Sequence, residues 1–74
     1  MTLDRLKPSQ RAVVRAIDCN QPSRGKLMDM GVIPGATITY VRPAPYGKGC
    51  QIEVKSTQLM LRGDLAEAIE VQQA

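Results

Sequence analysis

Few side chains in this chain of 74 residues could carry catalysis. There is no histidine, so the usual general base near neutral pH is missing. Neither Cys19 nor Cys50 therefore has an imidazole that could activate it as a nucleophile. The acids are single and scattered, and the stretch 47–49 lacks the upstream glycine and the following Ser or Thr of a phosphate-binding loop. The sequence therefore predicts a binding module and not an enzyme.

A metal site would have to combine the two cysteines with carboxylates from distant segments. Cys50 alternates with Ile52 and Val54, which is more typical of a small core residue than of a ligand. We therefore predict no cofactor and no resident metal. Fe(II) or Zn(II) bound through Cys19 or Cys50 is kept as the weaker alternative. In a reducing compartment both thiols are expected to stay unpaired.

Positive charge is concentrated in the first part of the chain. The net charge is +3, and residues 1–42 hold seven basic and three acidic side chains, against three and four in residues 43–74. A lopsided basic surface favours an acidic partner. Nucleic acid is the competing partner, but such proteins stack bases on aromatic side chains, and only Tyr40 and Tyr46 are present. Protein binding is the favoured interpretation, and nucleic-acid binding is the alternative.

The expected location is the cytoplasm. Asp4, Arg5 and Lys7 stand where the apolar region of a secretory signal would lie. The uncharged run 31–41 is too short for a membrane span, and Pro34 and Gly35 interrupt it. The length of the chain allows a single domain, residues 1–74, and we expect no insertion into the membrane.

A mainly β domain must position these side chains. Compact β-branched runs and alternating patterns predict five short strands, at residues 11–17, 37–42, 50–55, 58–62 and 69–71. Ser56-Thr57 would be a tight connection and residues 72–74 a frayed tail. An edge-free arrangement of five short strands is a small barrel. Asp64 and Glu67 match a capping box, which predicts a helical turn before the last strand.

A short helix is expected between the first two strands, from about Pro22 to Met30, capped by Asn20 or Ser23. Leu27, Met28 and Met30 would form the apolar face that packs on the sheet.

The helix is predicted to stop at Gly31. A glycine there adopts the left-handed conformation without a Cβ penalty, and Val32 would fold back onto Leu27 or Met28. Pro34 and Gly35 suit the two central positions of a type II turn, after which the second strand begins.

Four segments together resemble the ferrous iron transport protein A (FeoA) family. These segments are Lys26-Leu-Met-Asp-Met-Gly-Val-Ile-Pro-Gly35, Val41-Arg-Pro-Ala-Pro-Tyr-Gly47, Leu61-Arg62 and Ile69-Glu-Val71. The resemblance implies an SH3-like barrel in the bacterial cytoplasm. It also implies a partner, the membrane ferrous iron transporter with a cytosolic GTP-binding domain, which the family assists or regulates.

Two segments depart from the family pattern. Gly47-Lys48-Gly49 stands where the family commonly has Gly-Asp-Pro, so any contact through that carboxylate is absent here. Ser9 replaces a common glycine, which concerns only a turn.

We predict that the partner is contacted from two places. Arg24 and Lys26 lie on the exposed side of the predicted helix, and Tyr46 and Lys48 lie at the tip of the loop.

Overall fold

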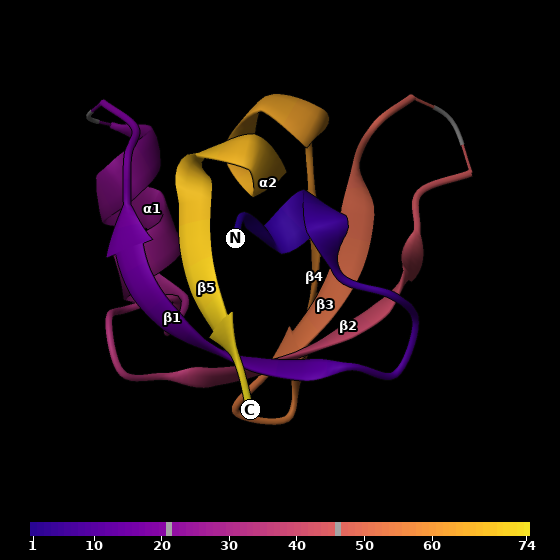
Figure 1. The fold of residues 1–74 in the computed structure, drawn as a ribbon. Coiled ribbons are helices and arrows are strands. Elements are labelled where there is room, and N and C mark those ends of the chain that lie inside the picture. The colour runs from indigo at the N-terminus through magenta and orange to yellow at the C-terminus, as the bar shows by residue number, and fades with distance from the viewer. Residues whose placement is uncertain (21, 46) are drawn as a thin grey trace.

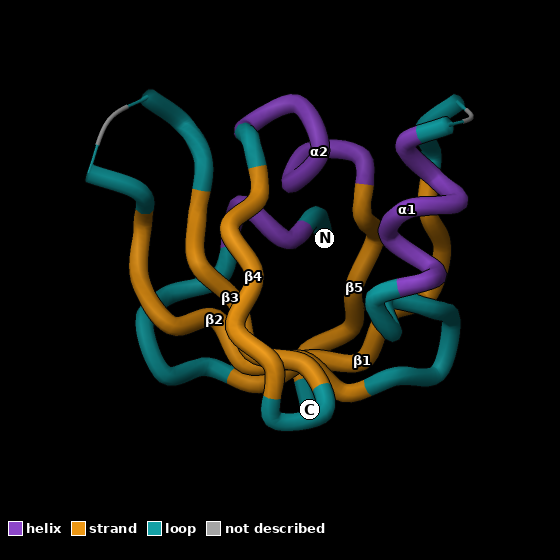
Figure 2. Tube along the Cα trace, turned by 180° about the vertical axis from the view of Figure 1, so that it is seen from behind, coloured by secondary structure: helices purple, strands orange, loops and turns teal. Residues whose placement is uncertain are grey.

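The computed structural model describes residues 1–20, 22–45 and 47–74. A curved antiparallel sheet surrounds a short N-terminal helical turn, and one helix lies over its upper end (Figures 1 and 2). The elements in chain order are η1 (Leu3–Arg5), β1 (Arg11–Ile17), α1 (Ser23–Asp29), β2 (Thr37–Pro43), β3 (Cys50–Val54), β4 (Thr57–Leu61), α2 (Gly63–Ala68) and β5 (Ile69–Gln73). The prediction of a mainly β fold with a helix between the first two strands is confirmed.

The core is entirely aliphatic apart from one tyrosine and one cysteine. Cys50, Ile52 and Val54 of β3 all point inward, as their alternation predicted. Leu3 and Leu6 close one end of the core from the N-terminal segment. The other buried side chains are Ala12, Val14, Ile17, Leu27, Val32, Ile38, Tyr40, Leu61, Ala66, Ile69 and Val71. In the part of the chain that the structure describes, no polar or charged residue is buried.

The sheet is open and not edge-free, which corrects the prediction of a closed barrel. The strand order is β4-β3-β2-β1-β5, so β4 and β5 are the two edges. The chain passes from β4 to β5 through α2, and no ladder joins these two strands within the described residues. An alternating pattern predicts a strand, but it does not say whether two particular edges meet.

The turn between β3 and β4 comes one residue earlier than the sequence predicts. The turn between β3 and β4 consists of Lys55 and Ser56, with φ of 50° and 65°, and Thr57 already pairs with Val54. A two-residue turn with positive φ at both positions is type I′, which matches the twist of the strands.

The prediction of a frayed tail at residues 72–74 is also wrong. Gln72 and Gln73 pair with Val13 and Ala12 in β1, and the N–H of Ala74 donates to the carbonyl of Arg11 at 3.1 Å. The C-terminal residues therefore extend β5.

The stop of α1 at Gly31 is confirmed in detail. Gly31 has a φ of +96°, and its N–H donates to the carbonyl of Met28 at 3.0 Å. The N–H of Val32 reaches back to the carbonyl of Leu27 at 2.9 Å. These two bonds are the pair that defines a Schellman motif, and both Val32 and Leu27 are buried beside them.

The turn at Pro34 and Gly35 has the expected form. The N–H of Ala36 donates to the carbonyl of Ile33 at 3.0 Å, and Gly35 has a φ of +93°. The turn is also tied to β1, because the N–H of Gly35 donates to the carbonyl of Val14 at 2.8 Å. The whole stretch from helix stop to β2 is therefore anchored to the sheet.

The capping box predicted at Asp64 and Glu67 is wrong. Arg62 is the N-cap of α2, in an extended conformation, and no side chain caps this end. The backbone carbonyl of Arg62 accepts the first helical bonds, from the N–H groups of Leu65 and Ala66 at 3.1 and 3.0 Å. Asp64 therefore lies inside the first turn, where its charge favours the helix N-terminus without capping it.

Candidate functional site

Helix α1 presents the first pair of predicted contact residues. Arg24 and Lys26 are both exposed, as expected. Being two residues apart, they project from different faces of the helix. The predicted caps are not used, because Pro22 is the N-cap residue without a side-chain bond. Asn20 instead accepts the N–H of Arg24 through its backbone carbonyl, at 3.2 Å.

Exposed apolar side chains follow on the same segment, and the sequence analysis missed them. Of the three residues expected to pack on the sheet, only Leu27 is buried. Met28 and Met30 are 37% and 42% exposed, and Ile33 beyond them is 37% exposed. The helix has only seven residues and ends at Asp29, just before the stop at Gly31, so a single one of its side chains reaches the core. We call residues Arg24, Lys26, Met28, Met30 and Ile33 the helix surface. It has two faces, because Arg24 lies four residues before Met28 and Lys26 four residues before Met30.

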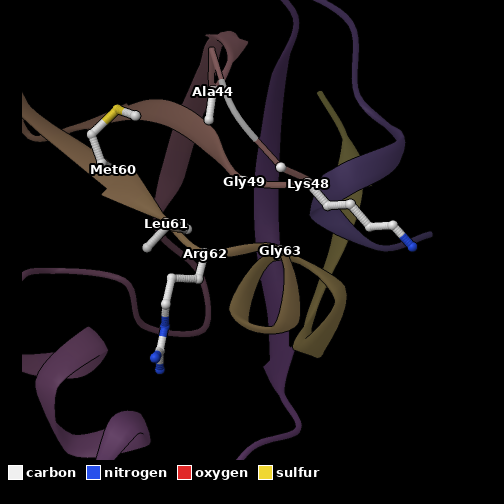
Figure 3. Close-up of a pocket in the computed structure, with 8 residues that line it drawn as sticks. Ala44, Lys48, Gly49, Met60, Leu61, Arg62 and Gly63 are labelled. Atoms are coloured by element: carbon white, nitrogen blue, oxygen red, sulfur yellow. The ribbon is translucent and has the colours of Figure 1, made fainter.

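The second pair of predicted contacts lies on the loop between β2 and β3. Lys48 is exposed, whereas Tyr46 lies outside the described residues. A pocket of about 380 Å³ opens between this loop and the junction of β4 with α2 (Figure 3). Its lining is formed by Ala44, Gly47, Lys48, Gly49, Met60, Leu61, Arg62 and Gly63.

Two glycines let the loop pack directly on that junction. A Cβ on Gly49 would lie 2.3 Å from the carbonyl oxygen of Leu61, and one on Gly63 would lie 2.6 Å from the Cβ of Lys48. The loop is closed by a bond from the N–H of Ala44 to the carbonyl of Gly49, at 2.9 Å. The Gly49 that departs from the family pattern is therefore required by the backbone path seen here.

The two pairs of predicted contacts do not form one patch. α1 and the loop between β2 and β3 lie at opposite sides of the molecule in both views, with α2 between them (Figures 1 and 2). In Figure 3 the side chains of Lys48 and Arg62 extend in different directions from the pocket. Arg62 pairs with Asp64 at 3.6 Å, but both side chains are exposed, so this pair stabilises the fold little.

The two cysteines are unpaired, and Cys50 is buried. Burial, together with the charge of Asp4, raises the pKa of the Cys50 thiol to about 11. A metal would have to displace the thiol proton against this raised pKa, which disfavours Cys50 as a ligand. Across residues 1–20, 22–45 and 47–74, no group of three or more His, Cys, Asp or Glu side chains could hold a metal ion.

The fold and these surfaces define a small, mainly β, SH3-like domain with exposed basic and apolar side chains on α1 and the residues that follow it. The FeoA domain model matches residues 1–73. The chain belongs to the FeoA family, which is linked to ferrous iron transport.

Individual relatives agree with this assignment. A Campylobacter jejuni protein assigned as Fe(2+) transport protein A is 25% identical over 71 residues, which cover 96% of each chain. The FeoA protein of Chlorobium tepidum has a TM-score of 0.92 at 33% identity, over 99% of this chain and 70% of that one. FeoA of Stenotrophomonas maltophilia, a zinc complex described as a prokaryotic SH3 domain protein, has a TM-score of 0.83 at 26% identity, over 97% and 89%.

Neither α1 nor α2 has the length and hydrophobicity that a helix needs to cross a membrane, and the described residues contain no other α-helix.

Proposed function

We propose that this chain is a cytoplasmic accessory module of bacterial ferrous iron transport that acts by binding the cytosolic GTP-binding domain of the membrane iron transporter. The observation that carries the proposal is the match of the FeoA domain to residues 1–73, nearly the whole chain. The sequence contains no histidine and offers no catalytic constellation, which is consistent with a role through binding.

The helix surface supports binding to a protein. Arg and Met are enriched in protein interfaces, and exposed apolar side chains beside cations suit a partner surface that is both acidic and apolar. The Schellman stop at Gly31 and the turn at Gly35 fix this segment to the sheet, so little order has to be gained on binding. We therefore assign the helix surface the larger share of the contact.

Lys48, on the loop at the opposite side of the molecule from α1, is proposed as a second contact. The prediction that Tyr46 joins it falls outside the described residues. A partner that engages both places would have to reach around α2. This arrangement predicts that charge reversal on α1 and charge reversal at Lys48 weaken binding independently, because the two sites are far apart and would touch different parts of the partner.

Uptake of ferrous iron by cells tests this proposal. Deletion of the chain should reduce uptake, and the wild-type chain should restore it. The double variant R24E/K26E should restore it poorly, while K7E, a charge reversal outside both proposed contacts, should restore it fully. Uptake that is unaffected by the deletion would refute the role in transport.

The structure adds no support for the alternative of nucleic-acid binding. Tyr40, one of the two aromatic side chains, is only 6% exposed and packs in the core, so it has no free ring face for a base. A gel shift that weakens steeply with salt would be needed to restore this alternative.

A further inference from the structure

The two outer edges of the sheet differ in whether another segment of the chain covers them. The outer edge of β5 is covered by the N-terminus: Thr2 forms a bridge with Glu70, and the N–H of Val71 donates to the carbonyl of Met1 at 2.8 Å. The outer edge of β4 has no such cover. Among the described residues, β4 pairs only with β3, and no hydrogen bond joins it to any other element.

The register shows which backbone groups this free edge offers. Val54 and Thr57 flank the two-residue turn, so they form a hydrogen-bonded pair. Hydrogen-bonded and non-hydrogen-bonded pairs alternate in an antiparallel ladder. Leu59 and Leu61 therefore bond to β3, while the N–H and C=O groups of Gln58 and Met60 point away from the sheet.

Nothing in β4 itself protects this edge. Natural edge strands usually carry a charge, a proline or a bulge that prevents pairing with another strand. β4 is Thr57-Gln-Leu-Met-Leu61, without charge or proline, and its register with β3 is regular. Met60 is 60% exposed and lines the pocket beneath the loop between β2 and β3.

The charges lie at the two ends of the strand. Lys55 precedes it in the turn, and Arg62 follows it, with Lys48 packed against the next residue, Gly63. Asp64 beside Arg62 is exposed and offsets this charge only in part. The stem of Lys55 lies against Gly31, with Cδ 3.5 Å from where a Cβ would stand. An extended segment lying along β4 would therefore meet an uncharged middle, Arg62 beyond one end, and at the other end the turn that carries Lys55.

We propose that the outer edge of β4 binds an extended segment of a partner protein, which adds to the sheet as a sixth strand. The segment has an acidic residue at each end and uncharged β-forming residues between them, with an apolar side chain beside Met60. Main-chain bonds to Gln58 and Met60 provide the pairing, and Lys55 and Arg62 select the charge. This inference rests on the proposed function only in taking the chain to be a protein-binding module.

A second copy of this chain is a poorer occupant. Antiparallel pairing of two β4 strands about Leu59 would satisfy Gln58 and Met60 of both copies. It would also bring Arg62 of each copy beside the turn that carries Lys55 of the other. Two chains of net charge +3 would meet with these cations in proximity, which disfavours the pairing.

Amide exchange with a synthetic peptide tests the inference. The probe has a glutamate at each end and alternating threonine and valine between, and the control peptide has lysine at both ends. At about ten times the dissociation constant, exchange at Gln58 and Met60 should slow about tenfold. The N–H of Leu59, already bonded to β3, should be unaffected, and the lysine peptide should give no protection.

Two matched variants separate edge pairing from side-chain contact. Met60→Pro removes an outward N–H at an edge position where proline is tolerated, and should abolish binding of the glutamate peptide. Met60→Val keeps the N–H and should bind within about threefold of wild type, because an exchange of one apolar side chain for another changes the packing little. If the proline variant does not fold, the exchange pattern in the wild-type chain still decides.

Peptide protection confined to α1, equal protection by the lysine peptide, or unchanged binding by the proline variant would overturn the inference. So would protection of Gln58 and Met60 that grows with protein concentration without peptide, which would identify a second copy as the occupant. If the transporter's cytosolic domain binds without protecting these amides, the inference fails and the proposed function stands. If the peptide protects these amides and the domain does not bind, the inference stands and the proposed function fails.

Discussion

A valine at position 31 would have to adopt the left-handed backbone that Gly31 holds at a φ of +96°. A Cβ there meets only ordinary contacts, the nearest being the Cδ of Lys55 at 3.5 Å. The Cβ itself therefore adds backbone strain without a clash, and from that strain we expect Gly31→Val to lower the free energy of unfolding by about 1–2 kcal/mol. Urea unfolding measures this loss. D-alanine at the same position, which favours positive φ, is the control and should leave stability unchanged or higher.

Cys50 makes stability depend on pH at the alkaline end. Burial, with a contribution from Asp4, raises its pKa to about 11 from the ordinary value of 9.0. Between these values the unfolded chain has lost the thiol proton while the folded chain retains it, so raising the pH favours unfolding. The contribution is fully present below pH 9 and is lost as the pH rises towards 11.

We expect the free energy of unfolding to fall more between pH 8 and pH 11 in the wild type than in Cys50→Ala. Burial, with contributions from Cys50 and Asp4, also raises the pKa of Tyr40, so Cys50→Ala removes part of the Tyr40 shift as well and the difference between the two profiles includes this coupling. Identical pH profiles for the two proteins would show that Cys50 titrates in the folded chain as it does in the unfolded one.

At the scale of elements, α1 is held to the sheet by one side chain. Leu27 is fully buried, whereas its neighbour Met28 is exposed. Leu27→Ala should cost about 2–5 kcal/mol, against a total stability of about 4–11 kcal/mol for a chain of this length. Met28→Ala should change stability by less than about 0.5 kcal/mol. Thermal melts compare the two, and similar losses would mean that Met28 shares the anchoring.

The loop between β2 and β3 is a second element whose placement depends on one residue. Gly49→Ala puts a Cβ against the carbonyl oxygen of Leu61, where backbone must move, and should cost about 1–3 kcal/mol. Gly47→Ala meets no atom within 4 Å and strains only its own backbone. Amide chemical shifts should therefore move at Leu61 and Arg62 in the first variant. Shifts there in both variants would contradict the packing described.

Features that depend on neighbours in sequence could be predicted, and features that depend on distant segments could not. The inward alternation of β3 and the stop and turn at Gly31 and Gly35 depend on neighbours in sequence, and they were predicted correctly. The sheet edges were not, because closure of a barrel depends on how α2 carries the chain from β4 to β5. The capping box failed for a similar reason: Arg62 is extended at the packed junction, so the helix begins before Asp64.

The candidate site was predicted only in part. Arg24, Lys26 and Lys48 are exposed as expected, but the fold separates the helix from the loop. Nothing in sequence spacing shows that two segments will lie at opposite sides of a sheet. The exposure of Met28 and Met30 was also missed, because an apolar pattern in a seven-residue helix does not say how much of it reaches the core.

The molecule as a whole carries a net charge of +3 and is proposed to meet its partner through basic and apolar side chains. Exposed charges act over a Debye length of about 30 Å at 0.01 M salt and about 8 Å at 0.15 M. Association with the transporter's cytosolic domain should therefore be faster and tighter at low salt.

Calorimetric titration of the wild-type chain with the purified cytosolic GTP-binding domain, in its GDP and GTP-analogue states, tests the central claim most directly. We expect saturable binding that weakens with salt and is reduced further in the R24E/K26E variant. No heat of binding in either nucleotide state at low salt, confirmed by an optical assay, would contradict the account.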